Sequence, residues 1–556
     1  MKTLEIITMP FSQNSINNLS GKGYSDYPVV YFLNNNSTVY IGETVAIRNR
    51  LRNHLKNSER KSLKKMTIII HEKFNRSATY NIETKLINYF LADERYKMQN
   101  KSQTVNSISH NYYDKPFYNE KIFNEIWDRL RQQKIVNNSR DVIENKDIYK
   151  LSPFKELSTD QIELKQKIIE VCEKQMDSDE PFVFLVKGEA GTGKSVVLSA
   201  VFNRIQELAK EKSSVLYNSN NYLLVNHTEM LKTYQKIAGK IKTLKKNNFD
   251  KPTSFINRQK KSNEKADIVF VDEAHLLLTK PDRFNNFNEN NHLEEIIKNS
   301  KIAIIVFDDK QVLKMKSYWD ENKLRQIVKG VKSQEYILKN QFRMNASEEM
   351  INWIDQFVEK KITPIPRENN FDFRIFESAD DMYKQIREKN NQVGLARMVS
   401  TFDYVHKKDG GTYYITEGKF KLPWNTTMGD TTWAERKETI DEVGSIYTIQ
   451  GFDLNYVGVI LGPSVSYDED KNELKIITEN YKDTEAFRGK DEFKDPDAVK
   501  EKIILNSINV LLKRGIKGLY IYASDLKLGN HLLKFYQNRG QKYGNMKVAE
   551  ANGDYH

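Results

Sequence analysis

The sequence predicts an α/β protein in which a small mixed α/β domain precedes two domains built on parallel sheets. Short apolar runs alternate with helix-forming stretches along most of the chain, which is the pattern of strand–helix–strand units. The chain also has 556 residues, more than one hydrophobic core usually organises. We therefore expect a first domain, a linker and two further domains, at 1–125, 126–155, 156–335 and 336–556.

The composition is that of a folded protein with a basic surface. Hydrophobic residues make up 39% and charged residues 29%, which is enough apolar material for real cores. The net charge of +12 favours a polyanionic partner, because neutralised phosphates release counterions, although a solvated basic surface is the alternative. The single cysteine, Cys172, excludes a disulfide framework within the chain and a thiolate zinc cluster.

The chain shows no segment that would take it into or across a membrane. No run approaches the roughly 18 uninterrupted apolar residues that a bilayer crossing needs. The N-terminal residues, MKTLEIITMPFSQN, lack the long apolar core of a signal peptide. We therefore expect no membrane partner and a cytoplasmic location.

The first domain begins with short strands and helices. The apolar runs at 29–33 and 38–42 are expected to be strands joined by an asparagine-rich turn. A basic helix from about 45 to 56, a third strand at 66–70 and a helix at 78–91 follow. These elements predict a small mixed α/β unit.

The rest of the chain follows a polar, charged connection. Six apolar runs after this connection are expected to be strands of two parallel sheets, at 182–186, 214–218, 267–271, 302–307, 456–462 and 519–524. The segment 242–265 is basic and rich in asparagine, and we expect a mobile surface loop there rather than a defined nucleic-acid grip.

The most specific motif is GEAGTGKS at 188–195, which lies between an expected strand and a helix-forming run. Backbone N–H groups can curl around phosphate oxygens where glycine permits it, at Gly188, Gly191 and Gly193. Lys194 can reach the outer phosphates of ATP, and Ser195 can ligate Mg²⁺. A flexible glycine turn is the alternative, but it does not account for the matching flanks.

A pair of carboxylates follows the expected strand at 267–271. Asp272 can hold magnesium, and Glu273 can align or deprotonate the attacking water. A structural salt-bridge pair is the alternative. Together with the phosphate loop, this pair fits kinases, transporters and motors alike, so the choice among them depends on later motifs.

Those later motifs favour a motor. Asp308 and Gln311 have the D-x-x-Q spacing that resembles the γ-phosphate sensor of superfamily-one helicases. Arg343 in QFRM and Arg514 in VLLKRG are suitable as fingers that neutralise charge on the transferred phosphoryl group. The order of motifs resembles two RecA-like domains flanking one nucleotide. By this resemblance Gln161 in LSTDQ would read the adenine, and Gln450 in TIQGFD would make a further nucleotide contact.

Residues from about 157 to 526 are similar to the Schlafen-like family of predicted DNA/RNA helicases. The resemblance lies in LKNQFRMNASEEMINWID, in LPWN followed by DEVGSIYTIQGFDLNYVGVILGP, and in NVLLKRGIKGLYIYASD. Lys513 stands where a threonine is common in the last motif. The resemblance implies ATP hydrolysis coupled to nucleic acid, and leaves open strand separation, translocation or a conformational switch.

The first domain contains residues suited to phosphodiester cleavage. Tyr31 and Tyr40 fall on neighbouring expected strands, Arg50 and His54 share one face of the next helix, and Glu83 lies on the helix after it. Cleavage needs a carboxylate for a divalent ion, a cation for the phosphate charge and a general base, and these residues supply that set. The alternative is that the tyrosines only pack and the Arg/His face is solvated.

These residues resemble the GIY-YIG nuclease family, which includes intron homing endonucleases and the UvrC repair nuclease. VVY matches the first signature except that Val29 replaces glycine, YIG matches fully, and the arginine and histidine follow the second tyrosine at the family's spacing. Glu43 stands where UvrC-like members carry lysine, and Asn106 resembles the family's late asparagine. The resemblance implies one Mg²⁺ or Mn²⁺ ion held by Glu83 and catalytic roles for Tyr31, Tyr40, Arg50, His54 and Glu83.

The leading hypothesis is therefore an enzyme that loads on DNA, runs on ATP and cuts phosphodiester bonds, and by analogy such a fusion suits antiphage defence. One alternative is a nucleic-acid-sensing ATPase switch whose first domain binds without cutting. Another is an RNA-directed enzyme, because net charge does not separate DNA from RNA. Several aromatic residues could stack bases but are expected mostly to pack in a core, namely Phe402, Tyr413, Tyr414, Trp424 and Trp433.

Overall fold

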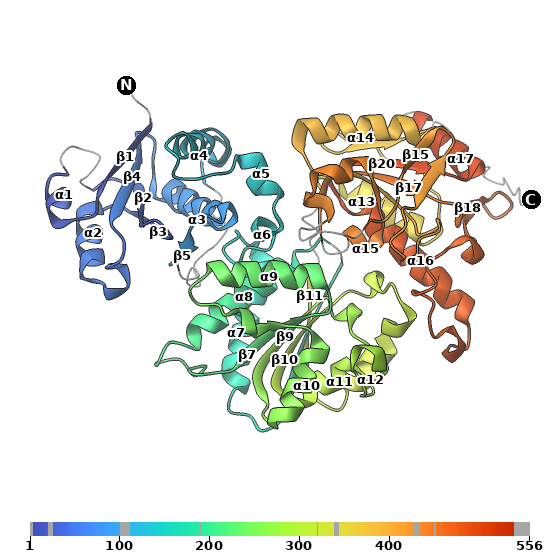
Figure 1. Cartoon of the computed structure of the whole chain (residues 1–556), viewed down its shortest axis with the longest axis horizontal. Coiled ribbons are helices and arrows are strands. Elements are labelled where there is room, and N and C mark those ends of the chain that lie inside the picture. Colours follow the sequence, from blue (N-terminus) through green and yellow to red (C-terminus); the bar gives the residue numbers. More distant parts are fainter. Residues whose placement is uncertain are drawn as a thin grey trace, which may run out of the picture. The chain divides into compact units, whose positions relative to one another are not determined.

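The computed structural model describes most of the chain (Figure 1), namely residues 4–19, 26–100, 112–189, 191–319, 321–338, 344–407, 409–426, 433–449 and 452–538. The chain divides into two compact units. The first spans Met1–Arg343 with Glu485–Lys490, and the second spans Met344–Thr484 with Asp491–His556. No helix within the described ranges is long and apolar enough to cross a bilayer.

The first unit begins with a five-stranded mixed sheet of order β1-β4-β2-β3-β5. The strands are β1 (Leu4–Pro10), β2 (Val29–Asn34), β3 (Thr38–Thr44), β4 (Lys65–His71) and β5 (Lys97–Met98). All neighbours are antiparallel except β5, which runs parallel to β3. The strands expected at 29–33, 38–42 and 66–70 are confirmed, whereas β1 was not predicted.

The continuous apolar run of β2 is explained by helices on both faces of the sheet. On one face, Tyr31 and Leu33 pack with residues of α2 (Ile47–Lys56). On the other face, the ring of Phe32 lies 5.4 Å from that of Phe90, which belongs to α3 (Arg76–Asp93). A strand that is covered twice needs apolar side chains in both directions, and every residue of β2 is buried. A short helix, α1 (Gln13–Asn17), contacts α2.

The segment predicted as a linker, 126–155, is largely helical and packs onto α3. It contains part of α4 (Phe123–Gln132) together with α5 (Arg140–Asn145) and α6 (Asp147–Lys150). Trp127 of α4 is fully buried, with its ring 5.0 Å from Tyr89 and 5.7 Å from Phe90. The polar average composition of this segment conceals an apolar helix face that repeats at helical spacing, made of Phe123, Ile126, Trp127 and Leu130.

The second sheet of the first unit has six parallel strands in the order β11-β6-β10-β9-β7-β8. Their bounds are β6 (Phe182–Gly188), β7 (Asn221–Val225), β8 (Phe249–Asp250), β9 (Ala266–Asp272), β10 (Ser300–Phe307) and β11 (Lys332–Leu338). The helices are α7 (Thr159–Gln175), α8 (Lys194–Leu208), α9 (Thr228–Lys240), α10 (Pro252–Ser262), α11 (His292–Lys298) and α12 (Glu321–Val328).

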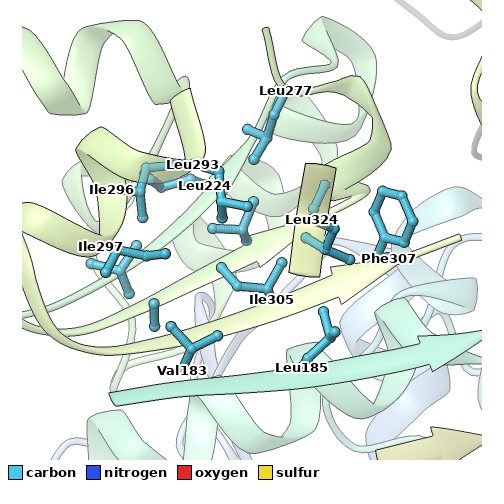
Figure 2. Packing of buried hydrophobic residues seen from close by; sticks show 14 of the residues in the cluster. Val183, Leu185, Leu224, Leu277, Leu293, Ile296, Ile297, Ile305, Phe307 and Leu324 are labelled. Atoms are coloured by element: carbon cyan, nitrogen blue, oxygen red, sulfur yellow. The ribbon is translucent and has the colours of Figure 1, made fainter. Parts of the chain in front are cut away.

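The core of this domain lies between the sheet and the later helices. Figure 2 shows Val183, Leu185 and Ile305 of the sheet in the same apolar cluster as Leu293 and Ile296 of α11. In Figure 1, α8 and α9 lie on the opposite side of the sheet from α10 and α11. The sheet is therefore covered on both faces, as parallel sheets usually are.

Two local predictions in this domain were wrong. The run 214–218 forms turns, and the strand is β7, a few residues later, because Val215 and Tyr217 are 56% and 41% exposed and find no core. The segment 242–265 is not a mobile loop over its length, since it contains β8 and α10. Helix α10 begins with Pro252 and buries Phe255 in the core, which its basic composition conceals.

The second unit contains another parallel sheet, of order β12-β20-β17-β13-β16, so the expectation of two parallel sheets is confirmed. Its strands are β12 (Asp372–Ile375), β13 (Ala396–Ser400), β16 (Val443–Gly444), β17 (Leu454–Leu461) and β20 (Gly515–Ala523). Its helices are α13 (Glu348–Val358), α14 (Ala379–Val393), α15 (Ile446–Ile449), α16 (Pro496–Leu512) and α17 (Leu526–Asn538).

Two hairpins complete the second unit, formed by β14 (Tyr414–Glu417) with β15 (Phe420–Pro423) and by β18 (Val465–Asp468) with β19 (Glu473–Ile476). Of the aromatic residues considered for base stacking, Phe402, Trp424 and Trp433 are buried in this unit. Core packing is therefore confirmed for these three, whereas Tyr414 is exposed.

Candidate functional sites

The two signature tyrosines lie on the same face of adjacent strands. Tyr31 of β2 pairs with Gly42 of β3, and Tyr40 lies two residues before Gly42, so the tyrosines are diagonal neighbours with ring centroids 6.3 Å apart. A Cβ on Gly42 would lie 2.6 Å from the hydroxyl of Tyr31. Only glycine at this position leaves room for the Tyr31 ring.

Helix α2 brings Arg50 and His54 to both tyrosines. The Nε2 atom of His54 lies 2.7 Å from the hydroxyl of Tyr31. Arg50 donates from Nε to the Tyr31 hydroxyl at 3.2 Å and from Nη2 to the Tyr40 hydroxyl at 3.4 Å. The ring centroids of Tyr40 and His54 are 4.9 Å apart. Four of the five predicted nuclease residues therefore form one cluster.

The electrostatics of this cluster fix its charge state near neutral pH. Burial, together with the charges of Arg50 and Arg60, lowers the pKa of His54 to about 4, so the imidazole is neutral. Burial raises the pKa of Tyr31 well above its usual value, so its hydroxyl keeps its proton. Because the Tyr31 oxygen already accepts from Arg50, the arrangement favoured is one in which its hydroxyl donates to Nε2 of His54.

Glu83, on α3, completes the predicted set. Burial and the nearby carboxylate of Glu43 raise the pKa of Glu83 to about 8, and Arg50 opposes this rise. Thr79, one turn earlier on α3, donates to Oε2 of Glu43 at 3.3 Å. A carboxylate disfavoured as a free anion is one that a divalent cation would stabilise. The structure thus brings Glu83 within electrostatic reach of Tyr31 and Arg50.

The donor set around Glu83 suits an ion that keeps most of its water. Within the described residues there is no group of three or more His, Cys, Asp or Glu side chains that could form a protein cage for a metal. Magnesium is commonly bound by one or two carboxylates, with water and phosphate oxygens in its other positions. Asn106, the late asparagine considered from the sequence, lies outside the described residues.

One residue of this site had no signal in the sequence. Arg60 ends a short 3₁₀ turn, η2 (Ser58–Arg60), and its guanidinium carbon lies 3.9 Å from the centroid of the Tyr40 ring. A basic residue in a polar loop is normally solvated, so sequence reasoning had no reason to single it out. The contact comes only from the fold.

The phosphate loop connects β6 to α8 and is closed by Gln161. Gly191 and Gly193 have φ angles of +91° and +76°, a conformation that favours glycine. The Nε2 atom of Gln161 donates to the carbonyl of Thr192 at 3.0 Å. A Cβ on Gly193 would lie 2.4 Å from that same Nε2 atom. The predicted adenine reader is therefore packed directly against the loop.

Lys194 joins the loop to the predicted phosphate sensor. Its Nζ atom donates to the carbonyl of Glu189 at 2.8 Å and lies 3.1 Å from Oδ2 of Asp308. Although burial raises it, Lys194 holds the pKa of Asp308 below its usual value. Gln311 donates from Nε2 to the same Asp308 oxygen at 2.7 Å. Lys194 and Asp308 are 114 positions apart in the sequence, and only the fold brings them together.

The predicted magnesium ligands also meet. Ser195 donates from Oγ to Oδ1 of Asp272 at 3.2 Å, and the hydroxyl of Tyr234 on α9 donates to Oδ2 at 2.7 Å. Burial and the neighbouring Glu273 raise the pKa of Asp272 to about 7, and a divalent ion beside the pair would favour its charged form. Sequence reasoning missed Tyr234, because a helical tyrosine is ordinarily a core residue.

Glu273 is held in a strained position beside this carboxylate. Its φ angle is +49°, which costs ~1–3 kcal/mol for a residue other than glycine. Its Oε2 atom is buried, lies 3.4 Å from Nε2 of His275 and accepts no hydrogen bond from the described residues. A strained residue with a free buried oxygen is common where a water molecule or substrate must be oriented.

The prediction for the nucleotide site also included Arg343, Gln450 and Arg514. Arg343 and Gln450 are outside the described residues. Arg514 lies in the second unit, between α16 and β20, where it is buried and donates from Nη1 to the carbonyl of Phe452 at 3.3 Å. Lys513, at the family's threonine position, contacts Oδ1 of Asp355 at 2.7 Å.

Comparison with solved structures finds helicases that cover much of the chain. The Pif1 helicase of Candida albicans is 12% identical and covers 69% of this chain and 99% of its own, with a TM-score of 0.27. Dbp5 of S. cerevisiae bound to RNA and ADP BeF3 is 12% identical and covers 69% and 92%, with a TM-score of 0.31. An arterivirus helicase, nonstructural protein 10 with DNA, is 14% identical and covers 66% and 65%, with a TM-score of 0.26.

Comparison of sequences identifies both parts of the chain. An uncharacterised protein of Saccharomyces cerevisiae, YPL245W, is 42% identical over 428 residues, which are 71% of this chain and 94% of that protein. The model of the GIY-YIG catalytic domain matches residues 27–97. The model of the Schlafen group 3 DNA/RNA helicase domain matches residues 181–525. The chain therefore belongs to the Schlafen group 3 helicase family and carries a GIY-YIG domain ahead of its helicase domain, which makes it an enzyme of the ATPase and endonuclease classes.

Proposed function

We propose that this protein is an ATP-driven nucleic-acid motor that cleaves DNA phosphodiester bonds with a divalent metal in its N-terminal domain. The observation that supports this best is the Tyr31 hydroxyl, which is bonded at once to Nε2 of His54 and Nε of Arg50. A second cluster around Lys194 and Asp272 is suited to nucleotide phosphates. The two clusters share no residue.

At the nuclease site, the chain's own residues would balance charge and accept a proton. Arg50 stays charged, because the two tyrosines raise its pKa despite burial, and it can neutralise the scissile phosphate. The Tyr31 hydroxyl would pass its proton to neutral His54 and take one from the attacking water. Glu83 would hold the Mg²⁺ or Mn²⁺ ion, which supplies Lewis-acid chemistry at the phosphate.

At the ATP site, Lys194 would exchange its carbonyl contact at Glu189 for the outer phosphates. Ser195 and Asp272 would hold Mg²⁺, which neutralises phosphate charge when bound. Glu273 would align or deprotonate the water. The other roles expected from the sequence remain proposals. The loop glycines Gly188, Gly191 and Gly193 would contact the phosphates, Gln161 would read the adenine and Gln450 would make a further nucleotide contact. Gln311 would sense the γ-phosphate, and Arg343 and Arg514 would neutralise charge on the transferred phosphoryl group.

Nicking of supercoiled plasmid tests the nuclease. Wild-type protein with Mg²⁺ or Mn²⁺ is expected to nick, and EDTA is expected to stop it. Glu83→Gln removes the ligand and is expected to be inactive, whereas Glu72→Gln, an exposed carboxylate in the same domain, is expected to be active. Equal nicking by Glu83→Gln and wild type would overturn the assignment of the metal site.

Competition between matched DNA and RNA duplexes tests the substrate. Both nucleic acids fit the charge of +12 and the family's DNA/RNA description. We expect DNA to compete better and to stimulate phosphate release from ATP. Stronger competition by RNA, with cleavage of RNA in the same assay, would replace DNA cleavage by the RNA-directed alternative. Binding and ATP turnover without cleavage of either would favour the sensing switch.

The biological setting proposed is defence against invading DNA such as that of a phage. The support is the fusion itself, since a motor that tracks along DNA and cuts it suits destruction of foreign genomes. Expression in a phage-sensitive host tests this. Wild-type protein is expected to lower phage yield, and Glu83→Gln is expected not to.

A further inference from the structure

Arg60 is buried in an unusual way beside the nuclease cluster. Its side chain is 8% exposed, and arginine is almost never buried this deeply unless it is paired. Its Nη1 atom donates to Oε1 of Gln99 at 2.6 Å, and its Nε atom has no hydrogen-bond partner among the described residues. Within those residues it forms no salt bridge with a carboxylate, so the main partner of its charge is the ring of Tyr40 at 3.9 Å.

Residues 99 and 100, the first of which bonds to Arg60, also form hydrogen bonds with the strand that carries Tyr40. The backbone N–H of Gln99 donates to the carbonyl of Val39 at 2.9 Å. The side chain of Asn100 accepts from the N–H of Ile41 at 3.1 Å and donates to its carbonyl at 2.8 Å. Both chain neighbours of Tyr40 are therefore fixed from one side, and Gln99 links this frame to Arg60.

We propose that Arg60 is a positioning residue of the nuclease site, which fixes the ring of Tyr40 and places a second permanent positive charge beside His54. The inference rests on the proposed nuclease function. Its geometric basis is that Tyr40 contacts Arg60, Arg50 and His54 at once. A planar guanidinium can stack on a ring and donate hydrogen bonds in its own plane, which lysine does not do.

The charge of Arg60 has a consequence for His54 that packing alone would not have. After burial, Arg50 and then Arg60 lower the pKa of His54. The imidazole faces titratable or charged groups from each element around it, namely Tyr31 on β2, Tyr40 on β3, Arg50 on its own helix and Arg60 on η2. Both arginines keep the imidazole neutral, and a neutral imidazole is the form that accepts the hydrogen bond from the Tyr31 hydroxyl.

Two substitutions separate stacking from charge. Arg60→Lys keeps the charge and loses the planar stacking group, so we expect nicking roughly tenfold slower at saturating Mn²⁺ with the acid limb of its pH profile unmoved. Arg60→Gln loses the charge, so we expect that limb to move up by about one pH unit. Arg52→Gln is the matched control, since Arg52 is exposed on α2 and its Nη2 atom donates to Oδ1 of Asn17.

A second measurement does not depend on cleavage. The full chain with ¹³C-labelled histidine is titrated by NMR, with His54→Asn identifying the resonance. His54 is expected to titrate well below 6.5 in wild type, Arg60→Lys and Arg52→Gln, and closer to 6.5 in Arg60→Gln. An unchanged titration and unchanged pH profile in Arg60→Gln would overturn the inference. If Arg60→Gln fails to fold, a wild-type nicking rate in Arg60→Lys would overturn it instead.

These readouts distinguish the inference from the proposed function. If wild-type protein does not nick but the His54 titration responds to Arg60→Gln, the nuclease proposal is refuted. The placement of the Arg60 charge beside His54 is then still supported. A wild-type protein that nicks, with Arg60→Gln and Arg60→Lys equal to it in rate and pH profile, leaves the nuclease and removes the role of Arg60.

Discussion

Replacing Gly42 by alanine tests how closely the tyrosine pair is packed. The new Cβ would lie 2.6 Å from the Tyr31 hydroxyl, whereas ordinary contacts begin at 3.4 Å, so the overlap is the difference of about 0.8 Å. The ring carbon Cζ would be 2.7 Å away, so rotating the hydroxyl alone does not relieve the clash. Overpacking of this kind costs ~1–3 kcal/mol of the free energy of unfolding.

The same displacement should slow cleavage as well as lower stability. Moving the Tyr31 hydroxyl lengthens its 2.7 Å contact with His54, and a misplacement near 1 Å lowers a rate by about 10²-fold. We expect Gly42→Ala to nick plasmid about 10²-fold more slowly while hydrolysing ATP at the wild-type rate.

The matched control is Gly330→Ala, whose Cβ would meet nothing within 4 Å and which should change neither activity. Wild-type nicking and an unchanged melting temperature in Gly42→Ala would refute the reasoning, because the ring could then not be packed against this glycine.

Three further predictions concern single side chains. In EDTA, Glu83→Gln should melt at a higher temperature than wild type at pH 8.5, and this difference in melting temperature should close towards pH 4.5. Folding raises the pKa of Glu83 from 4.5 to about 8, so between these values the folded protein binds a proton that the unfolded chain does not. Wild type therefore loses stability as pH rises through this window, whereas the glutamine variant does not. Lys194→Ala should abolish phosphate release from ATP and lower the free energy of unfolding by ~3–5 kcal/mol, because it leaves Asp308 buried without its partner; adding Asp308→Asn should restore stability in a denaturant titration but not hydrolysis. Tyr234→Phe removes a hydrogen bond to Asp272 and should lower kcat for ATP by roughly tenfold, with KM changed little.

The sequence predicts an element well where burial alone decides the pattern of side chains. The runs that became β2 and β9 are covered on both faces, so their continuous apolar residues were a sufficient signal. The run at 214–218 carries the same residue types but only Leu216 is buried, and nothing in its composition records that. Average polarity likewise conceals the apolar face of α4 within a charged segment.

The candidate sites divide in the same way between local and tertiary information. Gly188 to Ser195 are contiguous, so the motif of the phosphate loop can be recognised from its own residues and flanks. The contact of Tyr234 with Asp272 joins residues 38 positions apart in the sequence. It exists only because α9 packs beside β7, and β7 is the neighbour of β9 in the sheet. Arg60 is similar, since its role depends on a ring and an amide that the fold brings to it.

Helix α9 shows why the two sites of the first unit are not separable pieces. Its Tyr234 donates a hydrogen bond to Asp272 of the proposed ATP site. At its C-terminal end, Lys240 donates to the carbonyl of Glu94, the cap of the helix that carries Glu83, and the next residue, Ile241, forms a β-bridge with Met98.

Met98 in turn pairs with Val39, one residue before Tyr40 on β3. A fragment that ended before α9 would lose the donor at the end of α3 and would expose the outer edge of β5. A cation at a helix C-terminus contributes ~0.3–1 kcal/mol or more when partly buried, and an uncovered strand edge invites pairing with other chains. Loss of cleavage in such a fragment would therefore not identify a catalytic residue, and the proposed catalytic residues have to be tested in the full chain.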